Sequence, residues 1–148
     1  MNKLYWIASA QVAYRAQRKQ ADGSEEFWKQ DISGFYRLPS KSGSPIALIP
    51  IDMALADARP ATDLATLGFR QPYLGYWYQS IVNEGDPNSL DPKRFAACCF
   101  PDNYEPGAYT FIVNENATVF KKDLGKRGGV DIFPADPFES GWKRANED

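Results

Sequence analysis

The chain has 148 residues, of which 43% are apolar and 14% aromatic, so it is large and apolar enough to bury a hydrophobic core as one domain. Its formal net charge is −2, and no long run of basic residues points to nucleic-acid binding. It contains no histidine, which excludes Ser–His and Cys–His nucleophile pairs and a Cys/His zinc cluster within this chain, whereas metals that take oxygen ligands remain possible.

The first segment predicts an amphipathic helix over residues 1–20. Its apolar residues recur at helical spacing, at i, i+3, i+4 and i+8: Leu4, Ile7, Ala8 and Val12. The second half is polar, and Asp22 and Gly23 follow as a stop signal. The apolar stretch is too short to span a bilayer. We therefore expect this helix to pack on the core with its polar end in solvent.

Residues 21–72 predict a connector with short helices. One helix is expected to begin after Ser24 as its N-cap, with acidic residues in its first turn. Another is expected to begin at Ile51, directly after Pro50. The stretch PSKSGSP between these helices, residues 39–45, has the composition of a surface loop.

Short runs rich in aromatic and β-branched residues follow and predict strands within residues 73–123. The runs are YLGYWYQSIV, RFAACCF, AYTFIV and ATVFKK. Their connections suit a four-stranded antiparallel meander, and the turn NEN is expected to place Asn114 or Asn116 at a positive φ. A helix followed by a sheet makes the predicted fold class α+β, with the N-terminal helix packed on the meander.

Residues 124–148 predict a tail interrupted by glycine and proline. Its apolar residues are expected to pack back against the sheet: Ile132, Phe133, Phe138 and Trp142. The helix, connector, sheet and tail are expected to form a single domain over residues 1–148.

Three stretches, in this order, are similar to those of a known group of proteins: LYWIASAQVAYRAQ, YLGYWYQSI and FPDNYEPGAYTFIVNENATVFKKDLG. The chain resembles a bacterial group of secreted, uncharacterised pilin-like proteins that is common in Planctomycetes. The resemblance implies a pilin-like fold whose first helix continues the membrane-inserted helix of a type IV prepilin, with the leader and the anchor missing from this chain.

The resemblance also implies an exported protein, periplasmic or on the cell surface, that touches the membrane only through the missing N-terminal segment. It implies partners that are other proteins of a pilus or secretion-type assembly, and it implies no reaction. Relatives often carry a calcium-loop-like turn after the first helix. Here the turn keeps Asp22, Gly23, Glu25 and Glu26 but lacks the repeated Asp-x-Asn/Asp spacing.

The two cysteines of the chain, Cys98 and Cys99, are neighbours in a predicted strand. Successive side chains of a strand point to opposite faces, so one thiol is expected to face the helix and the other the opposite side. We interpret both as small apolar residues. Two alternatives remain open: a vicinal disulfide, which requires a distorted backbone, and an intermolecular disulfide through the outward thiol.

Two acidic loops are weak candidates for binding calcium, which takes six to eight oxygen ligands. The first contains Asp22, Glu25 and Glu26, and the second contains Asp86 and Asp91. Neither loop has the repeated Asp-x-Asp/Asn spacing of an EF-hand. Solvated acids beside turns are the default interpretation of both.

An aromatic cluster in the first predicted strand is the strongest candidate for an interaction surface: Tyr73, Tyr76, Trp77 and Tyr78. In a strand these side chains divide between two faces. One set is expected in the core. The other is either covered by the C-terminal tail or exposed as a platform for a protein or a glycan.

These observations favour an exported structural or protein-interaction domain without catalytic activity, and we assign no catalytic residue and no cofactor. The alternative is a periplasmic or surface module that binds a small ligand, a glycan or calcium. An enzyme without histidine would need a carboxylate, tyrosine, lysine or thiolate mechanism, and no spacing in the chain brings such groups together.

Overall fold

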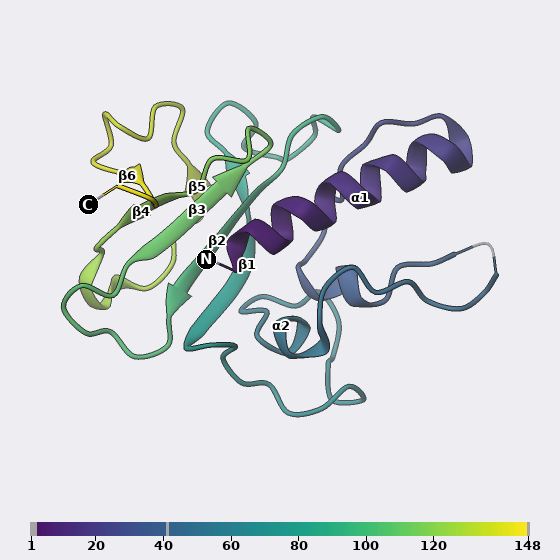
Figure 1. Cartoon of the computed structure of the whole chain (residues 1–148), viewed down its shortest axis with the longest axis horizontal. Helices are drawn as coiled ribbons and strands as arrows, with labels where there is room; N and C mark the ends of the chain where they lie inside the picture. Colours follow the sequence, from purple (N-terminus) through teal and green to yellow (C-terminus); the bar gives the residue numbers. More distant parts are fainter. Residues whose placement is uncertain (1–2, 41, 148) are drawn as a thin grey trace.

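The computed structural model describes residues 3–40 and 42–147 and consists of one long helix beside a mixed six-stranded sheet (Figure 1). The strand order in the sheet is β5-β1-β2-β3-β4-β6. The helices are α1 (Leu4–Asp22) and α2 (Ile51–Leu55), with 3-10 turns η1 (Ser33–Tyr36) and η2 (Gly125–Arg127). The strands are β1 (Tyr76–Asn83), β2 (Ala96–Pro101), β3 (Thr110–Asn114), β4 (Phe120–Lys122), β5 (Ile132–Phe133) and β6 (Lys143–Arg144).

The predicted four-stranded antiparallel meander is wrong, because the C-terminal tail adds a strand to each edge of the sheet. After β4 the chain crosses the sheet so that β5 pairs with β1 in parallel, with Val82 opposite Ile132. It then returns, and β6 pairs antiparallel with β4, with Phe120 opposite Arg144. The added strands have two residues each, too short to show the alternation that predicts a strand.

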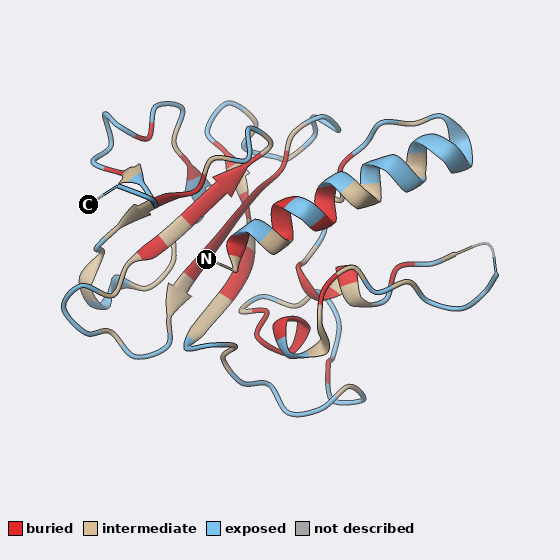
Figure 2. Cartoon of the chain, in the orientation of Figure 1, coloured by how far each residue is buried: buried red, intermediate tan, exposed pale blue. Residues whose placement is uncertain are grey.

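Helix α1 ends at Gly23, whose φ of 78° suits glycine and whose N–H donates to the Lys19 carbonyl at 3.0 Å. Only its first half packs on the sheet, against β2 and β3, and Figure 2 shows the second half exposed. Val12, predicted to face the core, is 64% exposed, whereas Gln11 is buried. Gln11, seven positions after Leu4, lies on the same helix face as Leu4, whereas Val12, eight positions after it, does not.

The part of the connector that precedes α2 differs in structure from the prediction. No helix follows Ser24, because its N–H donates to the Asp22 carboxylate at 2.9 Å and residues 24–29 run extended beside α1. The expected short helix at Ile51 is confirmed as α2. Between η1 and α2, Leu38 and Ile46 pair in an antiparallel bridge, which makes residues 38–40 and 42–46 the described part of a hairpin that projects from the body (Figure 1).

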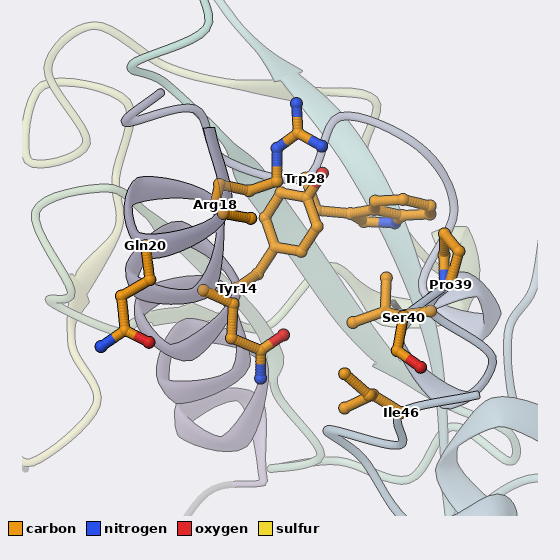
Figure 3. Close-up of a pocket in the computed structure, with 10 residues that line it drawn as sticks. Tyr14, Arg18, Gln20, Trp28, Pro39, Ser40 and Ile46 are labelled. Carbon is orange, nitrogen blue, oxygen red and sulfur yellow. The ribbon is translucent and has the colours of Figure 1, made fainter. Parts of the chain in front are cut away.

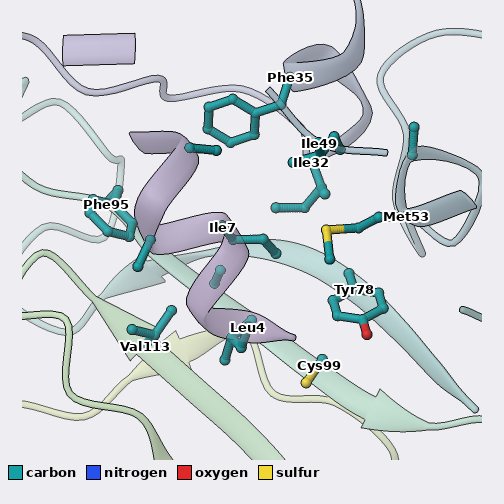
Figure 4. Packing of buried hydrophobic residues seen from close by; sticks show 14 of the residues in the cluster. Leu4, Ile7, Ile32, Phe35, Ile49, Met53, Tyr78, Phe95, Cys99 and Val113 are labelled. Atoms are coloured by element: carbon teal, nitrogen blue, oxygen red, sulfur yellow. The ribbon is translucent and has the colours of Figure 1, made fainter. Parts of the chain in front are cut away.

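The sheet separates two apolar clusters. The helix-side core lies between the sheet, α1 and the connector, and Figure 4 shows Leu4, Ile7, Phe35, Met53 and Tyr78 among its members. The tail-side core covers the opposite face and contains Ile81, Ala96, Cys98, Ile112, Phe120, Phe133 and Trp142. Of the four tail residues expected to pack there, Phe133 and Trp142 are buried, whereas Ile132 and Phe138 are about half exposed.

The β3–β4 turn places its positive φ at Ala117 (61°), and neither Asn114 nor Asn116 has a positive φ. The left-handed region costs a residue with a Cβ about 1 kcal/mol, and glycine avoids this cost. The choice of alanine therefore leaves strain in the turn.

Ala117→Gly is expected to raise the free energy of unfolding by about 1 kcal/mol, because glycine relieves the left-handed strain. Urea denaturation followed by circular dichroism measures the change. Ala16→Gly, at an exposed position within α1, is the matched control and is expected to lower stability by about as much. Equal destabilisation by both substitutions would contradict the assignment of strain to Ala117.

Candidate functional site

An open groove lies between the second half of α1 and the hairpin of residues 38–40 and 42–46, which project to the same side of the molecule (Figures 1 and 3). We call it the α1–hairpin groove. Its volume is about 630 Å³, within the range of ligand-binding sites. The residues that line it are Tyr14, Gln17, Arg18, Gln20, Ala21, Trp28, Leu38, Pro39, Ser40 and Ile46.

One wall of the groove is a continuation of the face that α1 buries against the sheet. Tyr14, Gln17, Arg18 and Ala21 recur at i, i+3, i+4 and i+7, and this spacing places them on one helix face. The same face earlier in α1 carries the buried residues Leu4, Ile7, Ala8 and Gln11. Because α1 extends past the sheet, the face that begins in the core ends in an open groove.

The floor of the groove is aromatic. The rings of Tyr14 and Trp28 lie 5.5 Å apart between centroids at an interplanar angle of 73°, an edge-to-face arrangement (Figure 3). The buried Gln11 amide fixes the Trp28 backbone, since its Oε1 accepts from the Trp28 N–H at 2.7 Å and its Nε2 donates to the Trp28 carbonyl at 2.8 Å. The indole N–H donates to the Asp31 carbonyl at 2.8 Å, which fixes the ring as well.

Gly34 is required by this floor. A Cβ added at residue 34 would lie 2.3 Å from a ring carbon of Trp28, far inside van der Waals contact. Any other residue there would displace the indole ring and change the shape of the α1–hairpin groove.

The first predicted calcium loop borders the groove, but two of its three acids are paired with cations of α1. Asp22 lies 2.9 Å from the Arg18 guanidinium, and Glu25 lies 3.1 Å from the Lys19 ammonium. The Ser24 N–H and Arg18 lower the pKa of Asp22, and Lys19 lowers the pKa of Glu25. Glu26 is exposed nearby.

In the second predicted calcium loop, a lysine of this chain supplies the positive charge. The Lys29 ammonium lies 3.7 Å from the Asp86 carboxylate and donates to the carbonyls of Asp91 and Arg94. The Asp86 oxygens also accept from the N–H groups of Leu90 and Asp91 at 2.9 and 3.1 Å. Over residues 3–40 and 42–147, no group of three or more acidic or cysteine side chains is arranged to hold a metal ion.

The predicted aromatic surface is divided by burial. Tyr78 is buried in the helix-side core, whereas Tyr73, Tyr76 and Trp77 are half-buried and pack against the same core. The ring of Tyr73 contacts Trp6 of α1 at 6.3 Å between centroids. The Trp77 indole N–H donates to the Asp102 carboxylate at 2.7 Å.

The two thiols point to opposite faces of β2, as the strand geometry predicts. Cys99 belongs to the helix-side core and Cys98 to the tail-side core, and both side chains are buried. The tail therefore covers the outward thiol. Burial raises the pKa of Cys98 to about 12, so this thiol is protonated at neutral pH and is a poor nucleophile.

Asp57 is a buried carboxylate that the sequence analysis did not single out. Its side chain is fully buried, and its two oxygens accept from the N–H groups of Ser33 and Arg59 at 2.8 and 2.9 Å. Burial raises its pKa, and the nearby charge of Asp31 adds to the shift. The backbone beside Asp57 pairs with Tyr78 of β1 in a parallel bridge, so the carboxylate ties two parts of the connector together next to its contact with the sheet.

Sequence reasoning also missed Tyr14, Arg18 and Trp28, the side chains that shape the groove. The signal for the first two was present, because they continue the helical spacing of Ile7 and Gln11. No comparable signal existed for Trp28 or for the hairpin, which reach the groove through contacts distant in sequence.

A comparison with models of protein families identifies the family of this chain. A model described as "Protein of unknown function (DUF2950)" matches residues 1–144. The chain belongs to the DUF2950 family. This confirms membership of an uncharacterised family, but the family description contains nothing about pilins or secretion. Searches of curated proteins and of solved structures find no match. Among the described residues of this DUF2950 protein, no helix has the length and apolarity needed to cross a bilayer.

Neither thiol is expected to react promptly with a thiol reagent such as DTNB at about pH 8, because both are buried and the pKa of Cys98 is raised. The same chain unfolded in urea should show two reactive thiols, which serves as the control. Prompt reaction of either thiol in the native chain would contradict this burial.

Asp57→Asn is expected to destabilise the fold by about 1–3 kcal/mol, because an amide has one acceptor oxygen where the carboxylate serves two N–H donors. The folded-state pKa of Asp57 lies above the ordinary value of 3.8, so the native chain loses stability as pH rises from that value through the folded pKa. The Asp57→Asn variant has no carboxyl group at this position, so its stability does not fall for this reason. The difference in free energy of unfolding between the native chain and the variant should therefore decrease from about pH 4 to about pH 7.

Urea denaturation at both pH values measures this cost. Asp63→Asn, at an exposed position, is the matched control and is expected to change stability by no more than about 0.5 kcal/mol. A cost for Asp57→Asn that is constant or grows with pH would contradict the raised pKa.

Proposed function

We propose that this chain is a non-catalytic protein-interaction domain that binds a segment of a partner protein in the α1–hairpin groove. The observation that carries the proposal is the continuation of the core-facing side of α1 into an open groove with an aromatic floor. Because this part of α1 extends past the sheet, the rings of Tyr14 on the helix and Trp28 on the connector are only half-buried. Aromatic rings of this kind supply much of the binding energy at protein interfaces.

The composition of the groove supports binding without catalysis. Its lining contains no carboxylate and no thiol, and Arg18 is its single charged residue among those described. General acid–base chemistry most often uses a histidine or a carboxylate, and the described lining contains neither.

The loops considered for calcium offer less support for the alternative function. Lys29 neutralises Asp86, and Arg18 and Lys19 neutralise Asp22 and Glu25. We therefore place binding in the groove. Export and a partner from a secretion-type assembly, which the resemblance implies, are part of this proposal.

Tyr14→Ala is expected to abolish or strongly weaken the binding of peptides selected from a random display library against the whole chain, because it removes half of the aromatic floor. A loss of about tenfold or more is expected for an aromatic side chain at the centre of an interface. Fluorescence anisotropy with labelled peptides measures the affinity.

Tyr5→Ala is the matched control, since Tyr5 is an exposed tyrosine on the same helix and does not line the groove. Thermal melts by circular dichroism verify that both variants are folded. A library that yields no binders, or binders equally affected by both substitutions, would overturn the proposal.

A further inference from the structure

Much of the described backbone around the groove is already hydrogen-bonded and offers no row of groups to an added strand. The N–H and carbonyl of Trp28 are bonded to the Gln11 side chain. On the opposite wall, the Leu38 and Ile46 N–H groups donate to each other's carbonyls at 3.0 and 2.8 Å. The remaining wall is α-helical, and its backbone N–H groups are bonded within the helix. A partner that binds by strand addition needs unpaired backbone groups, so this mode does not fit.

A partner helix fits poorly as well. A helix that binds in a groove inserts a row of apolar side chains along a continuous apolar trough. Beyond Tyr14, the α1 wall presents the polar residues Gln17, Arg18 and Gln20, with Ala21 as its one small apolar residue. The large apolar side chains of the groove thus lie on the aromatic floor and the hairpin wall.

A polyproline II segment matches both properties. Its backbone has no internal hydrogen bonds and is fully solvated, so scattered side-chain donors suffice for its carbonyls. Tyr14, Gln17 and Gln20 supply such donors along one wall. Aromatic-lined grooves are the usual receptors of proline-rich segments, and here the two rings of the floor stand at 73°.

Arg18 favours a segment that carries a carboxylate, because it is the charged residue of the described groove lining. The cations of this half of α1, Arg15, Arg18 and Lys19, are offset around the groove by Asp22, Glu25 and Glu26, so the selectivity rests on the Arg18 guanidinium itself. Arg18 lines the groove, and its buried Nε finds no acceptor among the described residues. A carboxylate placed beside this guanidinium would form a charge-assisted hydrogen bond.

We infer that the α1–hairpin groove binds an extended, proline-rich segment of a partner protein that carries a carboxylate beside Arg18. This inference rests on the proposed function and specifies the chemistry of the bound segment. The prolines pack on the Tyr14 and Trp28 rings, and the carboxylate pairs with the guanidinium in competition with Asp22.

Four synthetic peptides of equal length test the inference on the whole chain by fluorescence anisotropy. One is proline-rich and acidic, one proline-rich and basic, one an acidic amphipathic helix, and one an acidic β-branched sequence. The acidic proline-rich peptide is expected to bind best, by about tenfold over each of the others. Its affinity should fall with added salt, since the contact with Arg18 is partly exposed.

Arg18→Gln locates the carboxylate contact. It is expected to weaken the acidic proline-rich peptide about tenfold and to leave the basic one within about twofold. Lys19→Gln is the matched control, because it removes the same charge and an exposed ion pair from the adjacent position, which does not line the groove. Equal loss in both variants would overturn the role of Arg18.

The outcomes separate this inference from the proposed function. Best binding by the helical, β-branched or basic peptide, abolished by Tyr14→Ala, would overturn the inference and leave the proposed function standing. If none of the four peptides binds while library-selected peptides still require Tyr14, the inference is likewise overturned and the proposed function stands. If no peptide from either source requires Tyr14, both fail.

Discussion

The pairing of the Gln11 amide with the Trp28 backbone is the contact on which the functional half of the molecule depends. Gln11 is the last buried residue of α1, at the point where the helix leaves the sheet. Its amide both donates to and accepts from one residue of the extended connector, which otherwise has no regular structure there. Because both groups are buried or half-buried, an unpaired amide would cost about 1–3 kcal/mol, so the pairing strongly favours one placement of the Trp28 ring. The groove floor, the contact with Gly34 and the position of the hairpin all follow from that placement.

The two faces of the sheet are completed by segments from opposite ends of the chain. The helix-side core combines α1 with the connector. The connector is joined to β1 by the backbone bridge between Asp57 and Tyr78, and the Asp57 carboxylate holds Ser33 and Arg59 beside that bridge. The tail-side core depends on Phe133 and Trp142, which cover Cys98. Adjacent cysteines suggest a reactive site, but here each thiol is a packed side chain of the core, one on each side of the sheet.

Local spacing in the sequence predicts the parts of this fold that are local. The stripe of Leu4, Ile7 and Ala8 identifies α1, Pro50 identifies the start of α2, and aromatic runs identify the central strands. The edge strands and the groove depend on contacts between distant segments, which spacing does not encode. Polar residues that are satisfied inside the fold are a second reason why the prediction and the structure differ. Gln11 is absent from the predicted apolar stripe because it is polar, yet it is buried and Trp28 satisfies its amide. The positive φ predicted at Asn114 or Asn116 lies at Ala117, and the Asn114 Oδ1 instead accepts from the Asn116 N–H.

The tail has a consequence for how this protein is made. Strands β5 and β6 lie outside β1 and β4 in the sheet, fall within residues 132–144 and are synthesised after the other four strands. Until those residues leave the ribosome, β1 and β4 present unpaired strand edges, and an unpaired edge is a template for association with other chains. Premature termination anywhere between β4 and β6 would therefore release a nearly complete domain with an open edge. The last short strands protect the chain from aggregation more than their few hydrogen bonds would suggest.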